Sequence, residues 1–430
     1  MMSPMDLIRK WLYLIGALWF VLNLPFQFDF PPTALGLMVF GLAWILRRDW
    51  RSFFRSCLSN PPWLMVFALY CWIAFGTTYT ENSAKGAREL ILKIPMIGWP
   101  LVLVGMERRL FIHRTTILKA FVWSMLLSSL LLLFLAIRDF VLTGESTVFF
   151  YKALFRWEMV PIHYFALFLS FSAALSLDWM LLKRSEEKIG AALGWSLALL
   201  IFIGMLALSA VRIQWLVLPV LLIMVWIEHL RSDRRLALPG VLLLLFSVAA
   251  FTLSPSVQKR LQESLVEWQA RNDKMEGYQT NERYYLWSHG TAMIAERPIL
   301  GYGTGGGNDA LNRSLFHEKA SFWDGEEMRP LNERRYNFHS AYLQHLGNHG
   351  IPGLLLLLLM LLFPLFKYKE AIGLQGQLFL WACLLSFTTE SMLQRQAGLF
   401  FFSFFYAWLI VYPVAADLRQ ETGARHRSER

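Results

Sequence analysis

Long apolar runs separated by short polar segments recur from one end of the chain to the other. Many reach about 18 residues with few charges, the length that crosses a bilayer as an α-helix. The runs lie roughly at 11–28, 32–46, 62–79, 90–105, 116–137, 161–182, 189–210, 213–229, 236–253, 340–366, 374–390 and 398–415. We therefore predict an all-α, polytopic membrane protein of about twelve transmembrane helices.

The composition favours a single integral membrane domain over residues 1–430. Hydrophobic residues make up 56% of the chain and charged residues 17%, against about 45–50% and about 25% in soluble domains. The net charge of +10 comes from basic residues in short loops between apolar runs. This distribution points to a lipid bilayer as the partner and argues against nucleic acid. The three cysteines form neither a disulfide framework nor a CxxC metal motif.

Basic residues concentrate in every second connecting segment. They are Arg9/Lys10, Arg47/Arg48/Arg51/Arg55, Arg108/Arg109/Arg114, Lys183/Arg184/Lys188, Arg231/Arg234/Arg235, Lys367/Lys369 and the tail after Arg419. Because such segments remain in the cytoplasm, both termini are predicted to be cytoplasmic and the long segment 254–338 to face the periplasm. We expect this insertion before span ten to be helical, with an amphipathic helix over 258–271. The first run follows Arg9-Lys10 without a clear cleavage site, so we expect it to be an uncleaved span.

Several arginines are candidates for binding an anion. Arg212 stands between two apolar runs, where it either extends to the outer headgroups or faces a cavity. Arg283 and Arg297 lie in the outward segment, and Arg395 lies at the outer end of the last hairpin with Glu390. A guanidinium suits two phosphate oxygens, although any of these residues can also be a solvated charge or a headgroup contact. Glu390 can pair with Arg395 or with another arginine.

Three histidines lie at or near the start of span ten. His339 at its mouth is a candidate general base, because imidazole titrates near neutrality; the alternative is a helix-start histidine bonded to backbone. His345 and His349 are four residues apart, a spacing that can bind metal, but no carboxylate follows in register, so we predict no metal site. The glycines of 301–307 lack Gly-Lys-Ser/Thr and a preceding strand, so we predict a tight turn rather than a nucleotide site.

Three motifs in this order carry a family resemblance. They are Ser209-Ala210-Val211-Arg212; Arg283 to Trp287 followed by Arg297-Pro298-Ile299-Leu300-Gly301-Tyr302-Gly303; and His339-Ser340-Ala341-Tyr342-Leu343 with Gly350-Ile351-Pro352-Gly353. Together they resemble the bacterial O-antigen ligase and O-antigen polymerase family of integral membrane glycosyltransferases. Ser340 stands where the family has asparagine, which weakens any role for a side-chain amide there. His163-Tyr164 is similar to a His-x-x-Tyr element of the family, imperfectly aligned.

The resemblance implies transfer of a glycan from a polyprenyl-diphosphate carrier to lipid A–core at the periplasmic side of the bacterial inner membrane. It implies a metal-independent, inverting reaction without a cofactor. Arg212 and Arg283, with Arg297 or Arg395, would neutralise the departing diphosphate, and His339 would take the proton of the acceptor hydroxyl. His163, Tyr342 and Glu390 are secondary candidates.

Four other functions remain open at this point. A polymerase would use a second carrier-linked glycan as acceptor, and a related enzyme would use a protein. A transporter or flippase is disfavoured, because the sequence shows no internal repeat and no paired charges at midplane. A structural partner would not need a histidine at the mouth of a span beside several outward arginines.

Overall fold

The computed structural model describes residues 3–26, 32–47, 49–107, 114–155, 160–185, 188–231, 282–316, 321–323, 328–330 and 335–428, with isolated residues between 233 and 262. The described part is almost entirely helical. The first half contains α1 (Pro4–Asn23), α2 (Pro32–Ile45), α3 (Trp50–Ser59), α4 (Pro61–Gly76), α5 (Ser83–Leu92), α6 (Ile94–Val104), α7 (Arg114–Thr143), η2 (Ser146–Phe149), α8 (Tyr151–Leu154), α9 (Ile162–Ser185), α10 (Ile189–Ser209) and α11 (Gln214–Leu230).

The second half carries the elements around the candidate site. These are α14 (Glu282–Glu296), α15 (Gly306–Leu315), β1 (Ser321–Trp323), β2 (Met328–Pro330), α16 (Ala341–Lys367), α17 (Lys369–Ser386), the 3₁₀ turn η5 (Met392–Gln394), α18 (Gln396–Tyr406), the π-helix η6 (Ala407–Val411) and α19 (Tyr412–Ser428). The strands β1 and β2 pair antiparallel, with Phe322 opposite Arg329. This small ribbon is a local exception to the predicted all-α fold.

Every predicted span except 236–253 coincides with a helix. That run and the predicted amphipathic helix 258–271 lie outside the continuously described residues. By length and composition, five helices of the described part can cross a membrane: Arg114–Thr143, Ile162–Leu182, Ile189–Ser209, Ala341–Lys367 and Gln396–Gln420. The pair α3–α4, bent by 82°, makes up to six, and Thr33–Ile45 and Gln214–Leu230 are shorter apolar helices. The count of about twelve is therefore not confirmed.

One predicted span is broken for a reason that the sequence contains. The run 90–105 divides at Lys93, where α5 ends and α6 begins. Helix α6 is only 11 residues long, with Pro100 inside it. A proline in a helix removes a backbone hydrogen bond, and a charged side chain is not tolerated facing lipid. Lys93 is instead buried in protein, with a relative exposure of 1%.

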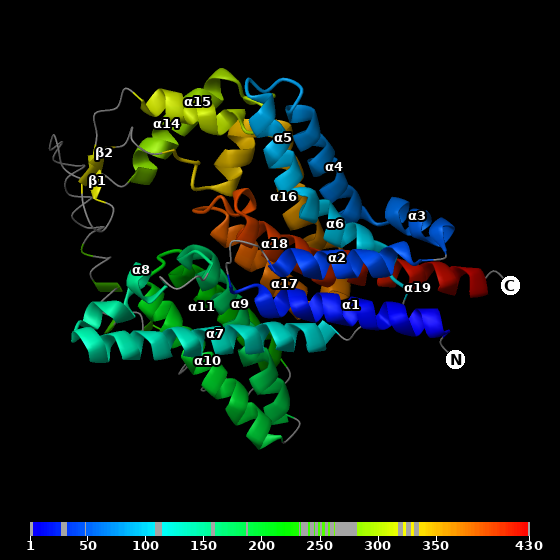
Figure 1. Cartoon of the computed structure of the whole chain (residues 1–430). Helices are drawn as coiled ribbons and strands as arrows, with labels where there is room; N and C mark the ends of the chain where they lie inside the picture. Colours follow the sequence, from blue (N-terminus) through cyan, green and yellow to red (C-terminus); the bar gives the residue numbers. More distant parts are fainter. Residues whose placement is uncertain are drawn as a thin grey trace.

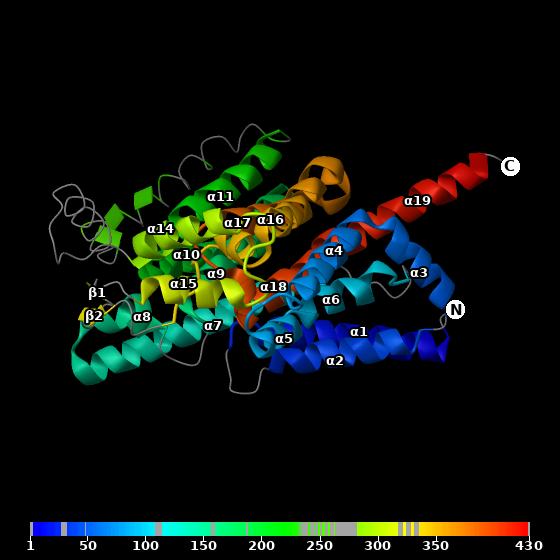
Figure 2. The same cartoon turned by 90° about the horizontal axis from the view of Figure 1, so that it is seen from above.

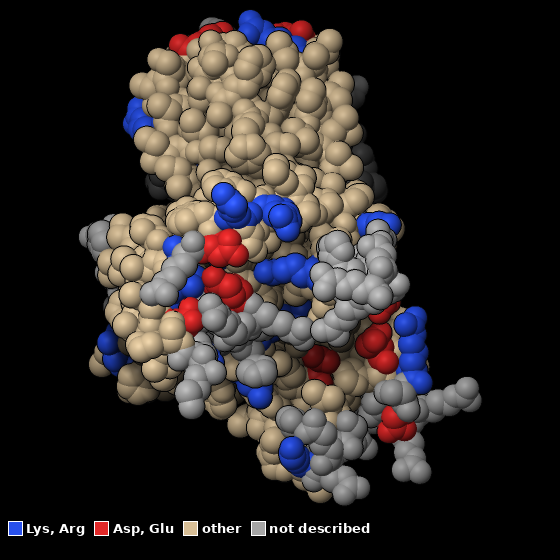
Figure 3. All heavy atoms as spheres, turned by 90° about the vertical axis from the view of Figure 1, so that its right-hand side faces the viewer, with Lys and Arg blue, Asp and Glu red and all other residues tan. Residues whose placement is uncertain are grey.

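The two termini lie at the same end of the molecule (Figures 1 and 2). Three basic segments predicted to share one side meet there around the turn 105–107. Arg9 pairs with Glu107 at 3.0 Å, Arg419 donates to the carbonyl of Met106 at 3.1 Å, and Arg47 donates to the carbonyl of Gly105. Figure 3 shows this end, with Lys and Arg side chains gathered beside a broad uncharged surface.

The last span runs through the middle of the helix assembly. In the span Gln396–Gln420, 89% of the most apolar 18-residue stretch is buried inside the protein. Phe404 stacks on Phe20 of α1, with ring centroids 4.6 Å apart, and Phe401 stacks on Phe168 of α9 at 4.4 Å. Because the span ends near the C-terminus, Arg395 at its beginning lies at the end of the span that is remote from the two termini (Figures 1 and 2).

A smaller hydrophobic core joins α14 and α15 to the first turns of α16. Its buried members include Leu286 of α14, Leu311 of α15, and Tyr336 and Phe338, which precede α16. Figures 1 and 2 show α14 and α15 lying together beside α16. The core therefore fixes the described part of the predicted periplasmic insertion to the helix that follows His339.

Candidate functional site

His339 directly precedes the capping residue of α16 and has an unusual backbone conformation. Its φ is 45°, a left-handed value that costs of order 1–3 kcal/mol for a residue other than glycine. Its backbone N–H donates to Asn337 Oδ1 at 2.8 Å. Ser340 is the N-cap, and its hydroxyl accepts a hydrogen bond from Leu343 N at 3.4 Å. Serine is among the best N-cap residues, which explains a serine at position 340.

The start of α16 is fixed to the loop between α17 and α18. Ser340 N donates to Ser391 Oγ at 3.1 Å, and Ala341 N donates to the carbonyl of Phe387 at 2.9 Å. These bonds use backbone donors that a helix start otherwise leaves unsatisfied. They hold His339 beside the loop of residues 387–395, which contains Glu390.

Phe338 fixes His339 from the other side. Its ring is fully buried between Gly290 of α14 and Gly347 of α16. A Cβ on Gly347 would lie 2.6 Å from the ring, so only glycine leaves the necessary space. Trp287 Nε1 donates to the carbonyl of Phe338 at 2.9 Å. Two helices therefore hold the backbone at the histidine.

Glu390 lies at the centre of a charged cluster assembled from four parts of the chain. Its Oε1 is 2.8 Å from Arg283 Nη2 at the start of α14 and 3.5 Å from His163 Nδ1 at the start of α9. Its Oε2 is 3.7 Å from His339 Nδ1. The carboxylate side chain is 9% exposed, whereas its three partners are 26–29% exposed. The cluster thus has a buried anion facing one guanidinium and two imidazole rings, all partly accessible.

The cluster keeps Glu390 ionised. Burial alone would raise the pKa of its carboxyl, but His163, His339 and Arg283 outweigh burial and lower the pKa from 4.5 to about 2. An ionised carboxylate next to a histidine Nδ1 favours the tautomer with its proton on that nitrogen. Nε2 of His339 would then carry the lone pair that accepts a proton.

Arg212 lies in the turn between α10 and α11, close in sequence to a buried polar link. Gln214, two residues later, accepts from Ser170 Oγ at 2.7 Å and donates to Ser386 Oγ at 3.1 Å. Ser386 is the last residue of α17 and precedes Glu390 by four positions. The turn that carries Arg212 is therefore fastened to the same loop region as the Glu390 cluster.

Arg395 lies on the other side of this loop, at the N-cap of α18, where it is exposed. Tyr164 packs against Gly398, since a Cβ there would be 2.8 Å from the tyrosine ring. Tyr164 follows His163 directly, and it has Glu390 and Arg395 as charged neighbours. Arg395 is thus near the cluster. Within the described residues, however, it forms no ion pair with Glu390.

Two other predicted residues have different surroundings. Arg297 stacks over the ring of Tyr302, with Cζ 4.6 Å from the centroid. It follows α14, which has 15 residues, so it lies about 20 Å along the helix axis from Arg283. The structure does not bring these two arginines together. Tyr342 donates its hydroxyl to the carbonyl of Leu384 at 2.8 Å and so links α16 to α17.

The glycine-rich turn 301–307 holds α4 against α16. Tyr302 N donates to the carbonyl of Gly347 at 2.9 Å, and Thr304 N donates to the carbonyl of Gly76 at 3.0 Å. Gly350 has φ +64° within α16, and a Cβ there would collide with the carbonyl oxygen of Ile299. These contacts agree with the predicted tight turn.

The sequence interpretation gave no role to a buried ion pair that also touches the loop. Lys93 Nζ is 2.6 Å from Glu89 Oε2, with side chains 1% and 15% exposed. With its amide nitrogen toward Glu89, Gln394 of η5 donates to both carboxylate oxygens at 2.8 and 3.0 Å. The sequence does contain a sign of this ion pair, because Glu89 and Lys93 carry opposite charges four residues apart at the start of an apolar run.

His345 and His349 are buried in α16 behind this ion pair. His345 Nδ1 is 2.9 Å from the carbonyl of Ala341, and His349 Nε2 is 3.1 Å from Thr304 Oγ1. Their ring centroids are 5.6 Å apart. Within the described ranges, no group of three or more His, Cys, Asp or Glu residues is placed to hold a metal ion. Each of these histidines thus has a structural contact.

Residues 197–358 match the family model described as O-antigen ligase. The match confirms the resemblance that the motifs carry. It includes Arg212, Arg283 and His339 but ends before Glu390. A protein of Haemophilus influenzae described as uncharacterized is 22% identical over 251 residues, which cover 54% of this chain and 59% of that protein. The chain therefore matches less than two thirds of that relative's length.

Proposed function

We propose that this chain, of which residues 197–358 match the O-antigen ligase family, belongs to that family and is a membrane glycosyltransferase that moves a glycan from a polyprenyl-diphosphate carrier to lipid A–core. The reaction would take place at the periplasmic side of the bacterial inner membrane. The observation that supports this most is the Glu390 cluster, in which one buried carboxylate contacts both His339 and Arg283. A base and a phosphate-binding cation are the two groups that such a transfer needs at one place.

The proposed reaction is a direct displacement. The acceptor hydroxyl oxygen forms a bond to the anomeric carbon of the donor while the bond from that carbon to the diphosphate oxygen breaks. The hydroxyl proton passes to His339 Nε2, and the bonding electron pair leaves with the diphosphate. Glu390 holds the Nδ1 proton of the ring and stabilises the imidazolium that forms. Attack from the side opposite the leaving group inverts the anomeric centre.

Arg283 and Arg212 are proposed to bind the diphosphate. Guanidinium is a planar fork that can contact a carboxylate and a phosphate oxygen together, so Arg283 can hold Glu390 and the donor at once. Arg212 would supply a second fork from the turn fastened to Ser386 through Gln214. Arg395 is a third candidate because of its position near Tyr164. Arg297 is not assigned to the diphosphate, since it stacks on Tyr302 at the far end of α14.

The test is transfer by the purified protein from carrier-linked glycan to lipid A–core, with EDTA present. The proposal needs neither metal nor nucleotide, because a sugar diphosphate already carries a good leaving group. We expect turnover by the wild type and loss of turnover in His339→Gln. Deleting the gene should cause carrier-linked long glycan to accumulate. Accumulation of carrier-linked single repeats would instead indicate a polymerase.

A further inference from the structure

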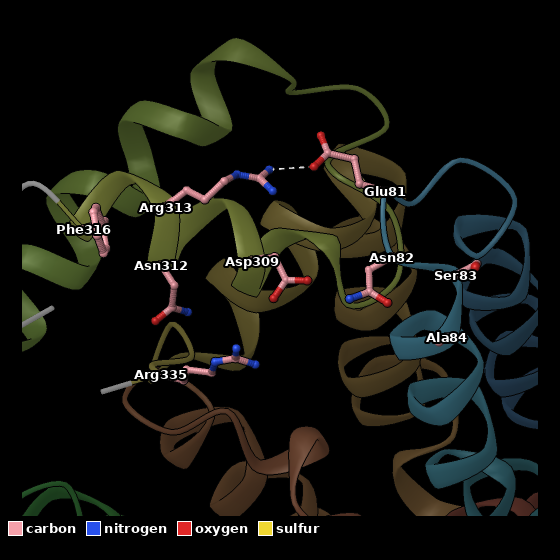
Figure 4. Close-up of a pocket in the computed structure, with 9 residues that line it drawn as sticks. All are labelled: Glu81, Asn82, Ser83, Ala84, Asp309, Asn312, Arg313, Phe316 and Arg335. Carbon is pink, nitrogen blue, oxygen red and sulfur yellow. Dashed lines mark ion pairs between the residues drawn. The ribbon is translucent and has the colours of Figure 1, made fainter. Parts of the chain in front are cut away.

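A polar groove lies between the start of α5 and helix α15, outside the Glu390 cluster. Its volume is about 630 Å³, within the range of ~300–1,000 Å³ usual for small-ligand sites. Figure 4 shows Glu81 and Asn82 on one wall, Asp309 and Arg313 of α15 on the other, and Arg335 below. The proposed reaction assigns no role to this groove.

The walls of the groove are joined by two ion pairs. Arg313 Nη2 is 2.8 Å from Glu81 Oε2, and Lys85 Nζ is 2.6 Å from Asp309 Oδ1. Both pairs connect α15 to the segment around the start of α5. They offset the charges of the two carboxylates, of which Asp309 is 29% exposed and Glu81 is 51% exposed. The groove is therefore built from paired polar groups that can still accept hydrogen bonds.

Two side chains complete the chemistry of the groove. Phe316 is 64% exposed, which presents a large apolar ring among polar neighbours. Arg335 is exposed, and within the described residues no carboxylate lies at ion-pair distance from it. The groove thus offers one aromatic ring, two paired carboxylates and an accessible guanidinium.

We propose that this groove binds saccharide units of a glycan substrate. Pyranose rings present apolar C–H faces that pack on an aromatic ring and hydroxyls that bond to carboxylate and guanidinium groups. Phe316, Asp309 and Arg335 supply these three partners. A docked amphipathic helix would need a row of apolar side chains, and a free diphosphate would leave the aromatic ring and the two carboxylates unused. The inference rests on the proposed function, which supplies a glycan as substrate.

The position of the groove connects it to the reaction centre. Arg335 precedes His339 by four residues, a separation of at most ~14 Å in an extended chain. Asn312 on the groove wall bonds to Tyr336 in both directions, accepting from its N–H at 2.8 Å and donating to its carbonyl at 2.8 Å. A glycan whose reacting end lies at His339 can therefore extend into the groove, which would then hold sugars away from the bond that is transferred.

The test compares Phe316→Leu, Phe316→Tyr and Arg335→Ala with the control Arg88→Ala. Arg88 is an exposed arginine of α5 that does not line the groove. In steady-state transfer, we expect Phe316→Leu and Arg335→Ala each to raise one KM about fivefold, equivalent to ~1 kcal/mol, without changing kcat. Arg88→Ala should leave KM unchanged, and Phe316→Tyr should raise it less than Phe316→Leu, because tyrosine keeps the ring face. A raised KM for donor places donor glycan in the groove, and a raised KM for acceptor places the core oligosaccharide there.

A binding measurement separates this inference from the proposed function. Saturation-transfer NMR with carrier-free polysaccharide and with core oligosaccharide reports binding without turnover. Loss of one saccharide's signal in Phe316→Leu, with the signal kept in Phe316→Tyr, supports the groove even if no transfer is found. Unchanged KM values together with unchanged saturation transfer in Phe316→Leu and Arg335→Ala would overturn the groove, while leaving transfer at His339 intact.

Discussion

Replacing Glu390 by glutamine is the sharpest test of the charged cluster. The change keeps the shape of the side chain but removes the charge that contacts Arg283, His163 and His339. The pKa of Glu390 is lowered from 4.5 to about 2, and a drop of this size corresponds to about 3 kcal/mol in favour of the ionised form. This is an upper figure for the loss of stability, because the partly exposed cationic partners can be hydrated in the variant.

The catalytic effect should be larger than the effect on folding. Without the carboxylate, His339 Nδ1 loses the ionised oxygen 3.7 Å away, and the imidazolium proposed to form during transfer loses its counter-ion. We expect kcat to fall about 100-fold or more, within the range for losing acid–base assistance. The KM for donor should change less. Steady-state transfer measurements and thermal unfolding of the same preparation measure the two effects.

Asp178→Asn is the matched control for this substitution. It removes another largely buried carboxylate with a histidine partner, since Asp178 Oδ1 is 2.9 Å from His229 Nε2, but it lies about 22 Å along α9 from His163 and outside the loop 387–395. Both variants should lower the melting temperature, whereas only Glu390→Gln should lower kcat about 100-fold. Wild-type kcat in a folded Glu390→Gln protein would refute the role of Glu390 in positioning the histidine.

The pH dependence of stability gives an independent check. A carboxyl whose folded-state pKa is depressed stabilises the protein fully above its unfolded-state pKa and loses that contribution as pH falls through the folded-state pKa. For Glu390 this window runs from 4.5 down to about 2. The difference in unfolding free energy between wild type and Glu390→Gln should therefore shrink as pH falls through this window. If this difference in unfolding free energy did not change at lower pH, the destabilisation of Glu390→Gln would be due to packing and not to the lost charge.

Three further outcomes are expected. His339→Gln should lower kcat by about 100-fold to 10,000-fold with donor binding retained, as measured by transfer and by donor titration; near-normal turnover would leave His339 as an acceptor-positioning residue. Arg283→Ala should lower the transition-state stabilisation measured from kcat/KM by on the order of 3 kcal/mol. Arg283→Lys should lower it by less, because lysine keeps the charge but lacks the planar fork of the guanidinium. Equal losses in the two variants would contradict this. Gly350→Ala should destabilise α16 by about 2 kcal/mol or more, since its Cβ meets the carbonyl of Ile299; an unchanged melting temperature would exclude that collision.

The apolar pattern predicted the helices well because each helix in lipid must satisfy its own backbone hydrogen bonds. The pattern predicted the lengths of the helices less well. A helix that is buried against other helices can be interrupted at a charged residue, whereas a helix that faces lipid cannot. Lys93 shows the difference: paired with Glu89 and enclosed by α5, α6 and α16, it interrupts a run that reads as one continuous span. The bend of 82° between α3 and α4 is a second case in which neighbouring helices set the geometry.

The sequence predicted which kinds of residue make up the candidate site, but not which of these residues contact one another. The sequence indicates that His339 and Arg283 lie on the outward side. It gives no means of choosing among Arg395, Arg283 and the other arginines as partner of Glu390. That choice depends on α14 packing against α16 through Phe338, which needs glycine at position 347 and packs closely against Gly290. Arg297 shows the same limit, because it belongs to the same sequence motif as Arg283 yet stacks on Tyr302.

Glu390 gives the site a charge balance that the family-matched segment alone lacks. Residues 197–358 contribute Arg212, Arg283 and His339, all cationic or able to become so. Cationic groups held together without an anion repel one another and lower the pKa of a neighbouring histidine. A buried carboxylate from the loop 387–395 offsets that repulsion before substrate arrives. In the proposed reaction, the negative charge of a bound diphosphate would take over part of this role at Arg283, and the Glu390 carboxylate would then stabilise protonated His339.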